Sequence, residues 1–454
     1  MKNNYDSTNK SYQSSLKNDG LNAKHSNMNS NSSFACEELN DLNYKLDEEC
    51  GWYVGDNSVW LYSQDNDVYY SSSLSRLFRL DQEKFKLIEM STNSELKEVS
   101  NKEISVANLD DKDEFTLFLE REIHAGTSVI PSPIKNLELC EDRYITKKQF
   151  FFNSKFQSPI TLFFSALFDG HAGINCVEYV HKRLLTNICA VFSQHMGRFS
   201  DKESSYRGKN CIYETDSTQI FSSHVVESLC KGITKGFEIT NNNFLSIARK
   251  NEVFDGTTAL VCIIFGPDPI DDKLKLVIGN CGDSKLILGY RSENNSISAK
   301  RLTRIHRLSD INERTRIEKA GGKVEFCNGA WRVLVKKQQR YSFDISAKCI
   351  GLCTSRSIGD IYMKEPQLLC ISDPEITVHE IDFDNDLFLI LATDGITDFF
   401  SDEELVGIIK KNLRSSPIEA AGELTKEAEK KGSLDDKTAT VIYFQWSISK
   451  LLNN

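Results

Sequence analysis

Short apolar runs and longer amphipathic segments come in groups, rather than in strict alternation, between residues 136 and 446 of this chain. Runs such as TLFFSALF, TTALVCIIF and DLFLILA have the length and apolar content of buried strands, whereas INCVEYVHKRLLTNI repeats its apolar residues at helical spacing. Grouped strands favour antiparallel sheets with helices packed outside them over a doubly wound parallel sheet. We therefore predict one large α+β domain in this region.

The rest of the 454-residue chain divides by composition. Residues 1–34 are rich in Asn, Ser and Lys and cannot bury enough apolar surface to offset the entropy of ordering, which predicts a disordered tail. Residues 50–90 carry aromatic residues between turn-forming clusters, which predicts a small β-rich module. We expect residues 91–130 to be a linker and residues 131–447 to form the large domain, and the stretch GTSVIPSPIKN (126–136) indicates a linker or an edge strand.

Charge and cysteine usage narrow the classes of protein. The formal net charge of −10 argues against nucleic acid or an anionic membrane as the main partner. Thirteen scattered cysteines without a CxxC pair indicate reduced thiols. The N-terminal residues lack the apolar core of a signal peptide, and no apolar run is long enough to span a bilayer. We expect a soluble intracellular protein of the cytoplasm, the nucleus or both.

Several predicted strands end at, or begin beside, an acidic residue. These residues are Asp169, Asp283, Asp394, Asp435 with Asp436, and the pair Glu141–Asp142. A carboxylate at the end of a buried strand is costly unless a partner neutralises it, and Lys and Arg are missing beside most of these positions. Because hard oxygen ligands suit Mg²⁺ or Mn²⁺, a divalent metal cluster is the simplest solution.

The triplet Asp169-Gly170-His171 adds two further chemical groups. Glycine lets the backbone approach an ion closely, so that its carbonyl can act as a ligand. Histidine is a poor ligand for a hard cation, and a proton-transfer role suits His171 better. The alternative is a structural histidine whose hydrogen bonds are satisfied within the fold.

Taken in order, the motifs of the large domain resemble the metal-dependent protein phosphatase family, the protein phosphatase 2C-type serine/threonine phosphatases. The matching stretches are FDGHAG, DGTTAL, GNCGDSKLIL, LCTSRSIGDIYMKEP, LFLILATDGITDFFSDEEL and GSLDDKTATVIYF. The resemblance implies an αββα sandwich of two antiparallel sheets flanked by helices. It also implies a centre for two Mg²⁺ or Mn²⁺ ions at one edge of that sandwich, with a third ion in some members.

The resemblance assigns a role to each matching residue. The metal positions are Asp169, Gly170, Asp394, Asp435, Glu141, Asp142 and Asp283. Asp169 would bridge the two ions and the Gly170 carbonyl would bind one of them. Glu141 and Asp142 would hold metal-bound waters, and Asp283 would help to bind the third ion. His171 would be the general acid in the hydrolysis of phosphoserine or phosphothreonine by a metal-activated water, so that the expected partners are phosphorylated proteins.

The chain also departs from the family pattern. Leu137 stands where the family has a phosphate-binding arginine, and Lys135 is the nearest preceding cation, so Lys135 is the candidate phosphate-binding residue. A lysine offers a point charge rather than a bidentate fork. Asp436 replaces an asparagine, Lys285 an arginine, and Ile305 the aspartate of an Asp-His pair. None of these changes removes a metal-binding acid.

Two alternatives follow from the same residues. The loss of the arginine at Leu137 is compatible with a pseudophosphatase, a catalytically weak member with a scaffolding or regulatory role. The aromatic residues of the 50–90 module could bind a peptide partner, or they could simply form the minimal core of that module. Metal-dependent hydrolysis of a phosphate ester distinguishes the enzyme from the scaffold.

Overall fold

The structure is a computed structural model of the whole chain. It describes residues 121–151, 160–199, 223–266, 268, 271, 273–327, 329–334 and 351–453, together with short strands within 45–89 and 214–219. Six of these strands form one antiparallel sheet in chain order: β1 (Lys45–Asp47), β2 (Trp52–Val54), β3 (Trp60–Ser63), β4 (Val68–Ser71), β5 (Arg76–Asp81) and β6 (Lys86–Glu89). The predicted tail, residues 1–34, lies outside the described residues.

The first sheet of the large domain is built around β9 (Ile160–His171). Its strands run in the order β20-β12-β9-β13-β14-β21, and β8 also pairs with β9. The bounds are β8 (Asp142–Phe151), β12 (Gly256–Thr257), β13 (Ala259–Phe265), β14 (Lys275–Cys281), β20 (Ile358–Gly359) and β21 (Glu375–Glu380). All these pairings are antiparallel, as the grouping of strands in the sequence predicts.

The second sheet has the strand order β16-β15-β22-β23-β7 and is also antiparallel. Its strands are β7 (Ile123–Ile130), β15 (Lys285–Arg291), β16 (Ile297–Arg301), β22 (Asp386–Ala392) and β23 (Lys437–Phe444). The last eight residues of the expected linker therefore belong to the sheet: β7 pairs with the whole length of β23, which gives the β23 edge its hydrogen-bond partners. Of the stretch 126–136, residues 126–130 thus lie in an edge strand, and residues 131–136 follow its end.

The two sheets pack face to face, and apolar side chains from alternate positions fill both faces of β9. Phe163 and Leu167 point into the layer between the sheets, where they join Leu391 and Ile442 of the second sheet. Phe164 and Phe168 point to the opposite face. Because side chains alternate along a strand, a run that is apolar at every position must be covered on both sides.

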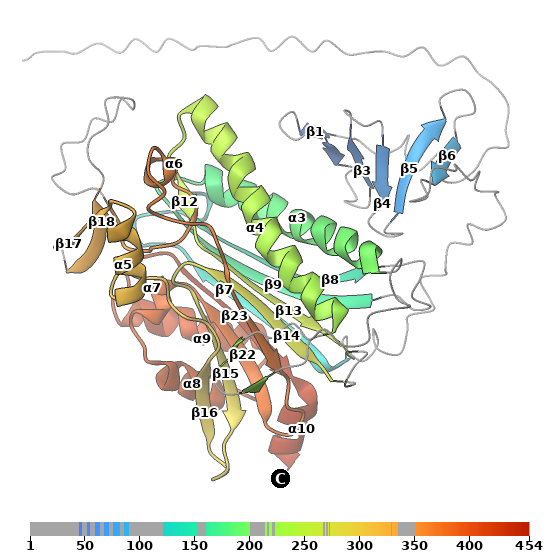
Figure 1. The fold of residues 1–454 in the computed structure, drawn as a ribbon. Coiled ribbons are helices and arrows are strands. Elements are labelled where there is room, and N and C mark those ends of the chain that lie inside the picture. The colour runs from blue at the N-terminus through green and yellow to red at the C-terminus, as the bar shows by residue number, and fades with distance from the viewer. Residues whose placement is uncertain are drawn as a thin grey trace, which may run out of the picture.

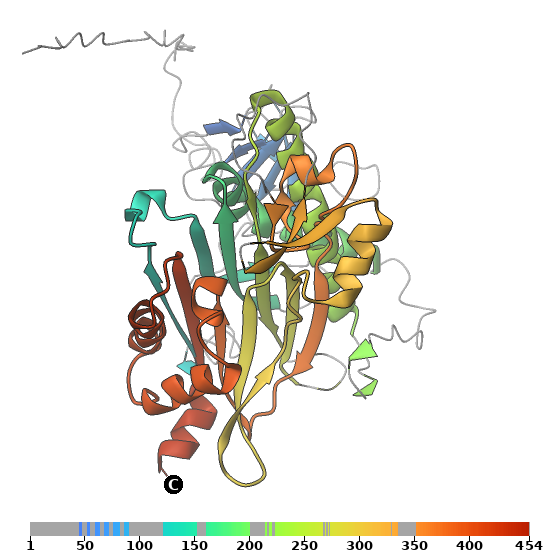
Figure 2. The same ribbon diagram turned by 90° about the vertical axis from the view of Figure 1, so that its left-hand side faces the viewer.

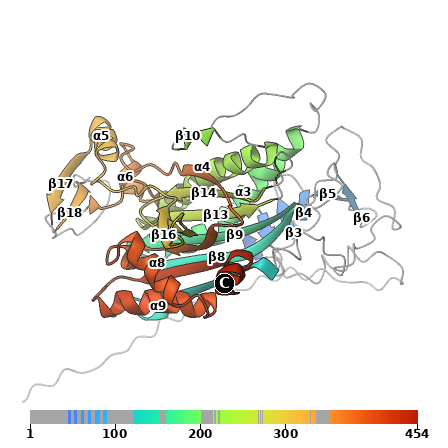
Figure 3. The same cartoon turned by 90° about the horizontal axis from the view of Figure 1, so that it is seen from below.

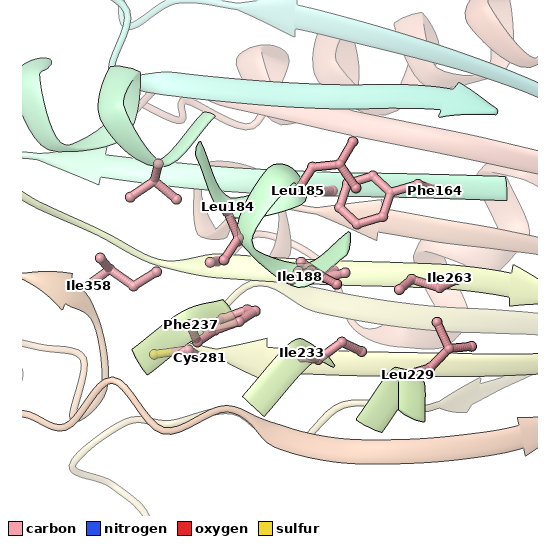
Figure 4. Packing of buried hydrophobic residues seen from close by; sticks show 14 of the residues in the cluster. Phe164, Leu184, Leu185, Ile188, Leu229, Ile233, Phe237, Ile263, Cys281 and Ile358 are labelled. Carbon is pink, nitrogen blue, oxygen red and sulfur yellow. The ribbon is translucent and has the colours of Figure 1, made fainter. Parts of the chain in front are cut away.

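Two long helices, α3 (Asn175–Phe199) and α4 (His224–Asn251), cover the outer face of the first sheet (Figures 1 and 3). Figure 4 shows side chains of both helices packed over the sheet, with Ile188 of α3 and Phe237 of α4 among them. The predicted helix face of α3, which includes Val180 and Leu184, is fully buried there.

The outer face of the second sheet is covered by α8 (Asp402–Lys411) and α9 (Pro417–Lys430) (Figure 3). Capping boxes start both helices, at Ser401 with Glu404 and at Ser416 with Glu419. A short helix, α7 (Asp394–Thr397), follows β22, and α10 (Gln445–Asn453) continues the chain beyond residue 447, the expected end of the domain. Helices thus lie outside both sheets, and the domain is an αββα sandwich.

A smaller unit stands at one end of the sandwich (Figures 1 and 3). It consists of α5 (Ile311–Lys319), α6 (Ile361–Lys364), β17 (Lys323–Cys327), β18 (Ala330–Leu334) and β19 (Gly351–Leu352), and it has its own apolar cluster. The hairpin of β15 and β16 extends at the other end, as Figure 2 shows. No helix among the described residues has both the length and the apolar character that crossing a membrane requires.

Candidate metal centre

The predicted acidic residues meet where strands of both sheets end, on the side of the smaller unit. Asp142, at the start of β8, lies opposite Asp169 in the β8–β9 register. Asp394 follows β22, and Asp435 precedes β23 in the second sheet. The Thr393 hydroxyl connects the two sheets by donating to the Asp142 carboxylate at 3.1 Å. Aspartates that are far apart in the sequence thus surround one small volume.

Repulsion among these carboxylates raises their pKa values. Burial, and then the charges of Asp394, Asp142, Asp283 and Asp435, raise the pKa of Asp169 well above its usual value. Burial and the neighbouring carboxylates also raise the pKa of Asp142 to about 7 and that of Asp394 to about 8. A cluster in this condition binds protons or cations readily, because either relieves the repulsion.

The Gly170 backbone lies very close to the segment that precedes β8. Its amide donates to the Glu141 carbonyl at 3.1 Å, and a Cβ atom at Gly170 would come within 2.5 Å of that same carbonyl oxygen. The neighbouring Asp169 carbonyl accepts from the Thr258 amide at 2.8 Å. Only glycine fits at position 170, and these two hydrogen bonds fix the position of the Asp169-Gly170 backbone within the acidic cluster.

The acidic pair before β23 has two different surroundings. Asp436 is buried and accepts hydrogen bonds from the Ser132 amide at 2.7 Å, the Glu141 amide at 2.8 Å and the Lys135 ammonium at 2.9 Å. Although burial opposes its ionisation, these donors lower the pKa of Asp436. Asp435 is exposed and accepts from the Asp436 amide at 2.8 Å. Asp436 therefore holds the segment before β23 in place through its hydrogen bonds, whereas the exposed carboxylate of Asp435 is accessible to a ligand.

Two cations enter the cluster from outside the acidic motifs. Lys135 pairs with Glu141 as well as with Asp436. The Arg307 guanidinium donates to Asp283 at 2.7 Å, to Asp394 at 2.8 Å and to Asp398 at 2.7 Å. Sequence reasoning treated the cluster as short of cations and missed Arg307, because it is not adjacent in sequence to any residue that it pairs with.

His171 is held by Asp360, a residue to which the sequence assigned no role. The His171 Nε2 atom lies 2.9 Å from both carboxylate oxygens of Asp360, whose side chain is completely buried. Burial opposes protonation of the imidazole, but the charge and hydrogen bonding of Asp360 outweigh it and raise the pKa of His171. A Cβ atom at Gly256 would come within 2.0 Å of Asp360, so this pair requires the glycine of the DGTTAL motif.

The donor set fits small, hard cations. One oxygen of Asp142, Oδ1, is buried and has no hydrogen-bond partner among the described residues. These carboxylates are neighbours, but among the described residues no three carboxylate, imidazole or thiol side chains are grouped tightly enough to hold a single ion without coordinated waters. Mg²⁺ typically keeps several waters and binds through one or two carboxylates, so this looser arrangement suits it.

The fold and the site define a class: an αββα sandwich with a carboxylate-rich centre at one end of its two sheets. A family model for Protein phosphatase 2C matches residues 135–437. The chain therefore belongs to the protein phosphatase 2C family, as its motifs predict.

Curated relatives share this region. The chain is 30% identical to Probable protein phosphatase 2C 69 of Arabidopsis thaliana over 280 residues, which cover 61% of this chain and 60% of the relative. It is 30% identical to Protein phosphatase 1L of Bos taurus over 280 residues, which cover 62% of this chain and 63% of the relative. The chain thus spans about three fifths of the length of these two relatives.

The fold is also found among solved structures, as one example shows. One described as a C. elegans sex determining protein has a TM-score of 0.50 and 21% sequence identity, with 72% of this chain and 67% of that chain covered.

Proposed function

We propose that this protein is a metal-dependent serine/threonine phosphatase that hydrolyses phosphoserine and phosphothreonine in other proteins. The observation that carries the proposal is the proximity of the Asp142, Asp394 and Asp435 carboxylates to that of Asp169, two residues before His171. Membership of the protein phosphatase 2C family supports the same reaction.

Mg²⁺ or Mn²⁺ is the proposed cofactor. Asp169, which lies among the other carboxylates, would hold these ions together with the Gly170 carbonyl, Asp394 and Asp435. Glu141 and Asp142 suit hydrogen bonds to coordinated waters. Two such ions, when bound, supply a water that is acidic enough to act as the nucleophile at neutral pH.

Asp283 has a mixed role in this proposal. Arg307 holds one of its oxygens at 2.7 Å, so Asp283 helps to bind a third ion only where that ion competes with the guanidinium.

His171 acts on the leaving group in the proposed reaction. Negative charge develops on the seryl or threonyl oxygen as its bond to phosphorus breaks, and a proton from His171 neutralises it. Asp360 engages Nε2, which leaves Nδ1 as the ring nitrogen available for this transfer. Asp360 also favours the protonated imidazole before the transfer. Asp360 is thus a positioning residue, and His171 is the general acid.

Lys135 is the proposed contact to the phosphate group. Its ammonium lies between Glu141 and Asp436 at the edge of the acidic cluster. Divalent cations at these carboxylates would compete with the lysine for Glu141 and so leave the ammonium able to turn toward a phosphate oxygen. The lone charge of a lysine is a weaker phosphate ligand than the bidentate fork of an arginine.

The test is hydrolysis of p-nitrophenyl phosphate and a phosphothreonine peptide in millimolar Mn²⁺ by the full chain. Wild type is expected to hydrolyse both, with activity removed by chelation, and Asp169→Asn and Asp394→Asn are expected to be inactive. A matched control is Asp384→Asn, which removes an exposed carboxylate on the β21–β22 loop. Inactive wild type, or full activity in both cluster variants, would contradict the proposal and would favour a pseudophosphatase.

A further inference from the structure

The three most exposed large apolar side chains of the described residues lie in segments beside the acidic cluster. Ile134 is 92% exposed, Leu434 77% and Leu137 67%, and Leu139 is also more than half exposed at 57%. We call these four side chains the apolar rim. Exposed apolar side chains that are grouped on a soluble domain are commonly sites of interaction.

The rim belongs to two segments that are connected directly to the candidate site. Ile134, Leu137 and Leu139 lie in residues 131–140, immediately before Glu141. Leu434 immediately precedes Asp435. The Ser132 hydroxyl donates to the Leu434 carbonyl at 2.6 Å, so the two segments lie side by side. The rim therefore borders the acidic cluster, and residues that flank a phosphorylated residue bound there lie within reach of it.

The backbone of the rim is held in place even though its side chains are exposed. The Ser132 amide is bonded to Asp436 at 2.7 Å, and the Asn136 side chain accepts from the Leu139 amide at 2.9 Å at the start of a 3-10 turn, η1 (Leu137–Leu139). A surface that is ordered before binding loses little conformational entropy when a partner covers it, so its apolar contacts add more fully to affinity.

We propose that the apolar rim binds apolar side chains that flank the phosphorylated residue of a protein substrate. The proposal rests on the proposed phosphatase function and adds a substrate preference to it. This proposal gives a physical reason for the departure from the family pattern at Leu137. Where the family has an arginine that contacts the phosphate, this chain has a leucine that contacts the polypeptide of the substrate. Selectivity then depends on the sequence around the phosphoresidue.

The test compares two phosphothreonine peptides that differ only in their flanking residues, leucine in one and serine in the other. Wild type is expected to show about three- to tenfold higher kcat/KM for the leucine peptide, mainly through KM, because partial burial of one or two leucine side chains contributes about 1 kcal/mol. The Leu137→Ser/Leu434→Ser variant is expected to lose this preference. Its activity on p-nitrophenyl phosphate, which has no flanking residues, is expected to stay at the wild-type level.

The matched control is Leu452→Ser on α10, which follows the end of β23 opposite to Asp435. This variant is expected to keep the preference. Equal kcat/KM for both peptides in wild type, or an unchanged preference in the double variant, would overturn the proposal. Melting temperatures check the fold, which exposed positions should leave intact.

Failure of this inference can be told apart from failure of the proposed function. Metal-dependent hydrolysis of p-nitrophenyl phosphate without a flanking preference would overturn the inference alone. If neither substrate is hydrolysed, the same two peptides are compared by fluorescence anisotropy in the presence of Mn²⁺, and equal affinity overturns the inference. A dimer that becomes a monomer in the double variant, without any peptide preference, would assign the rim to a second copy of the chain and would also overturn it.

Discussion

The imidazole of His171 is paired with the buried carboxylate of Asp360, although the two residues are 189 positions apart in the chain. The Nε2 atom is 2.9 Å from each of the two oxygens. This pair lies where β9, β12 and β20 meet, next to Asp169 of the acidic cluster. It fixes one ring nitrogen of the histidine and favours the charged imidazolium.

A leaving-group series tests the role of this pair. His171→Asn is expected to lower kcat for a phosphothreonine peptide by about 100-fold, because the alkoxide leaving group needs a proton. The loss for p-nitrophenyl phosphate is expected to be much smaller, since nitrophenolate leaves without one. Asp360→Asn should show the same pattern with a smaller loss. His379→Gln breaks a comparable His–Asp pair, with Asp386 at 2.8 Å, and serves as the control. Equal losses on both substrates would mean that His171 does not protonate the leaving group.

The second prediction concerns the effect of Arg307 on metal binding rather than on the rate of hydrolysis. Its guanidinium neutralises Asp283, Asp394 and Asp398, so Arg307→Gln leaves the cluster more negative. Mn²⁺ is then expected to bind at least about tenfold more tightly, or in larger number, because a competing positive charge within a few ångströms has gone. Isothermal titration calorimetry measures both quantities without substrate. Arg301→Gln, which removes an ion pair with Asp402 outside the cluster, is the control, and an Arg307 variant that titrates like it would refute this role.

Acid stability depends on Glu313 of α5. Burial opposes ionisation of Glu313, but the Arg356 guanidinium at 2.6 Å and the Ser355 hydroxyl at 2.9 Å help to lower its pKa to about 2. The folded pKa is below the unfolded value of about 4.3, so this stabilisation is present above about pH 4.3 and is lost as pH falls toward 2. At neutral pH it amounts to at most about 3 kcal/mol.

Glu313→Gln is therefore expected to lower the free energy of unfolding at pH 7, with the difference from wild type shrinking between about pH 4.5 and 2. Urea denaturation at pH 7, 4.5 and 3 measures this difference. Glu318→Gln removes an exposed carboxylate from the same helix and should match wild type at each pH. A Glu313 variant whose deficit is independent of pH would show that packing, not charge, is what the substitution disturbs.

The missing arginine can be restored. Leu137 is 67% exposed and lies two residues after Lys135, so Leu137→Arg adds a guanidinium near the proposed phosphate contact. A severalfold lower KM for p-nitrophenyl phosphate is expected from one additional charge-assisted contact to phosphate. Leu368→Arg, at an exposed leucine in the segment after α6, is the control. An unchanged KM would indicate that the new side chain does not reach the phosphate or that Lys135 already fills the role.

The sheets and the acidic cluster were predictable because both have a local signal in the sequence. A run such as FFSALF must be a buried strand, and an aspartate after it must lie at the end of that strand. Antiparallel pairing then brings strand ends from distant segments together, as it brings Asp142 opposite Asp169. The motif order supplied the rest of the set, including Asp435.

The residues that partner the cluster had no such signal. Arg307 lies 24 residues from Asp283 and 87 from Asp394, and its role depends on how α5 and its preceding loop fold back over the strand ends. Asp360 lies within a quoted motif, but nothing local connects it to His171. Residues 123–130 contain Gly126, Thr127 and Ser128, which are typical of a linker. They form a strand because they pair with the edge of β23, and that pairing has no local signal in the sequence.

The central claim is that the carboxylates around Asp169 form one divalent metal centre. The most direct test is the number of Mn²⁺ ions bound per chain, measured by equilibrium dialysis for wild type, Asp169→Asn and the control Asp384→Asn. Wild type is expected to bind at least two Mn²⁺ ions per chain. Because Asp169 lies among the other carboxylates, the Asp169→Asn variant is expected to bind fewer. The control is expected to bind as many ions as wild type. An Asp169→Asn variant that binds as many Mn²⁺ ions as wild type, with the same affinity, would contradict the account.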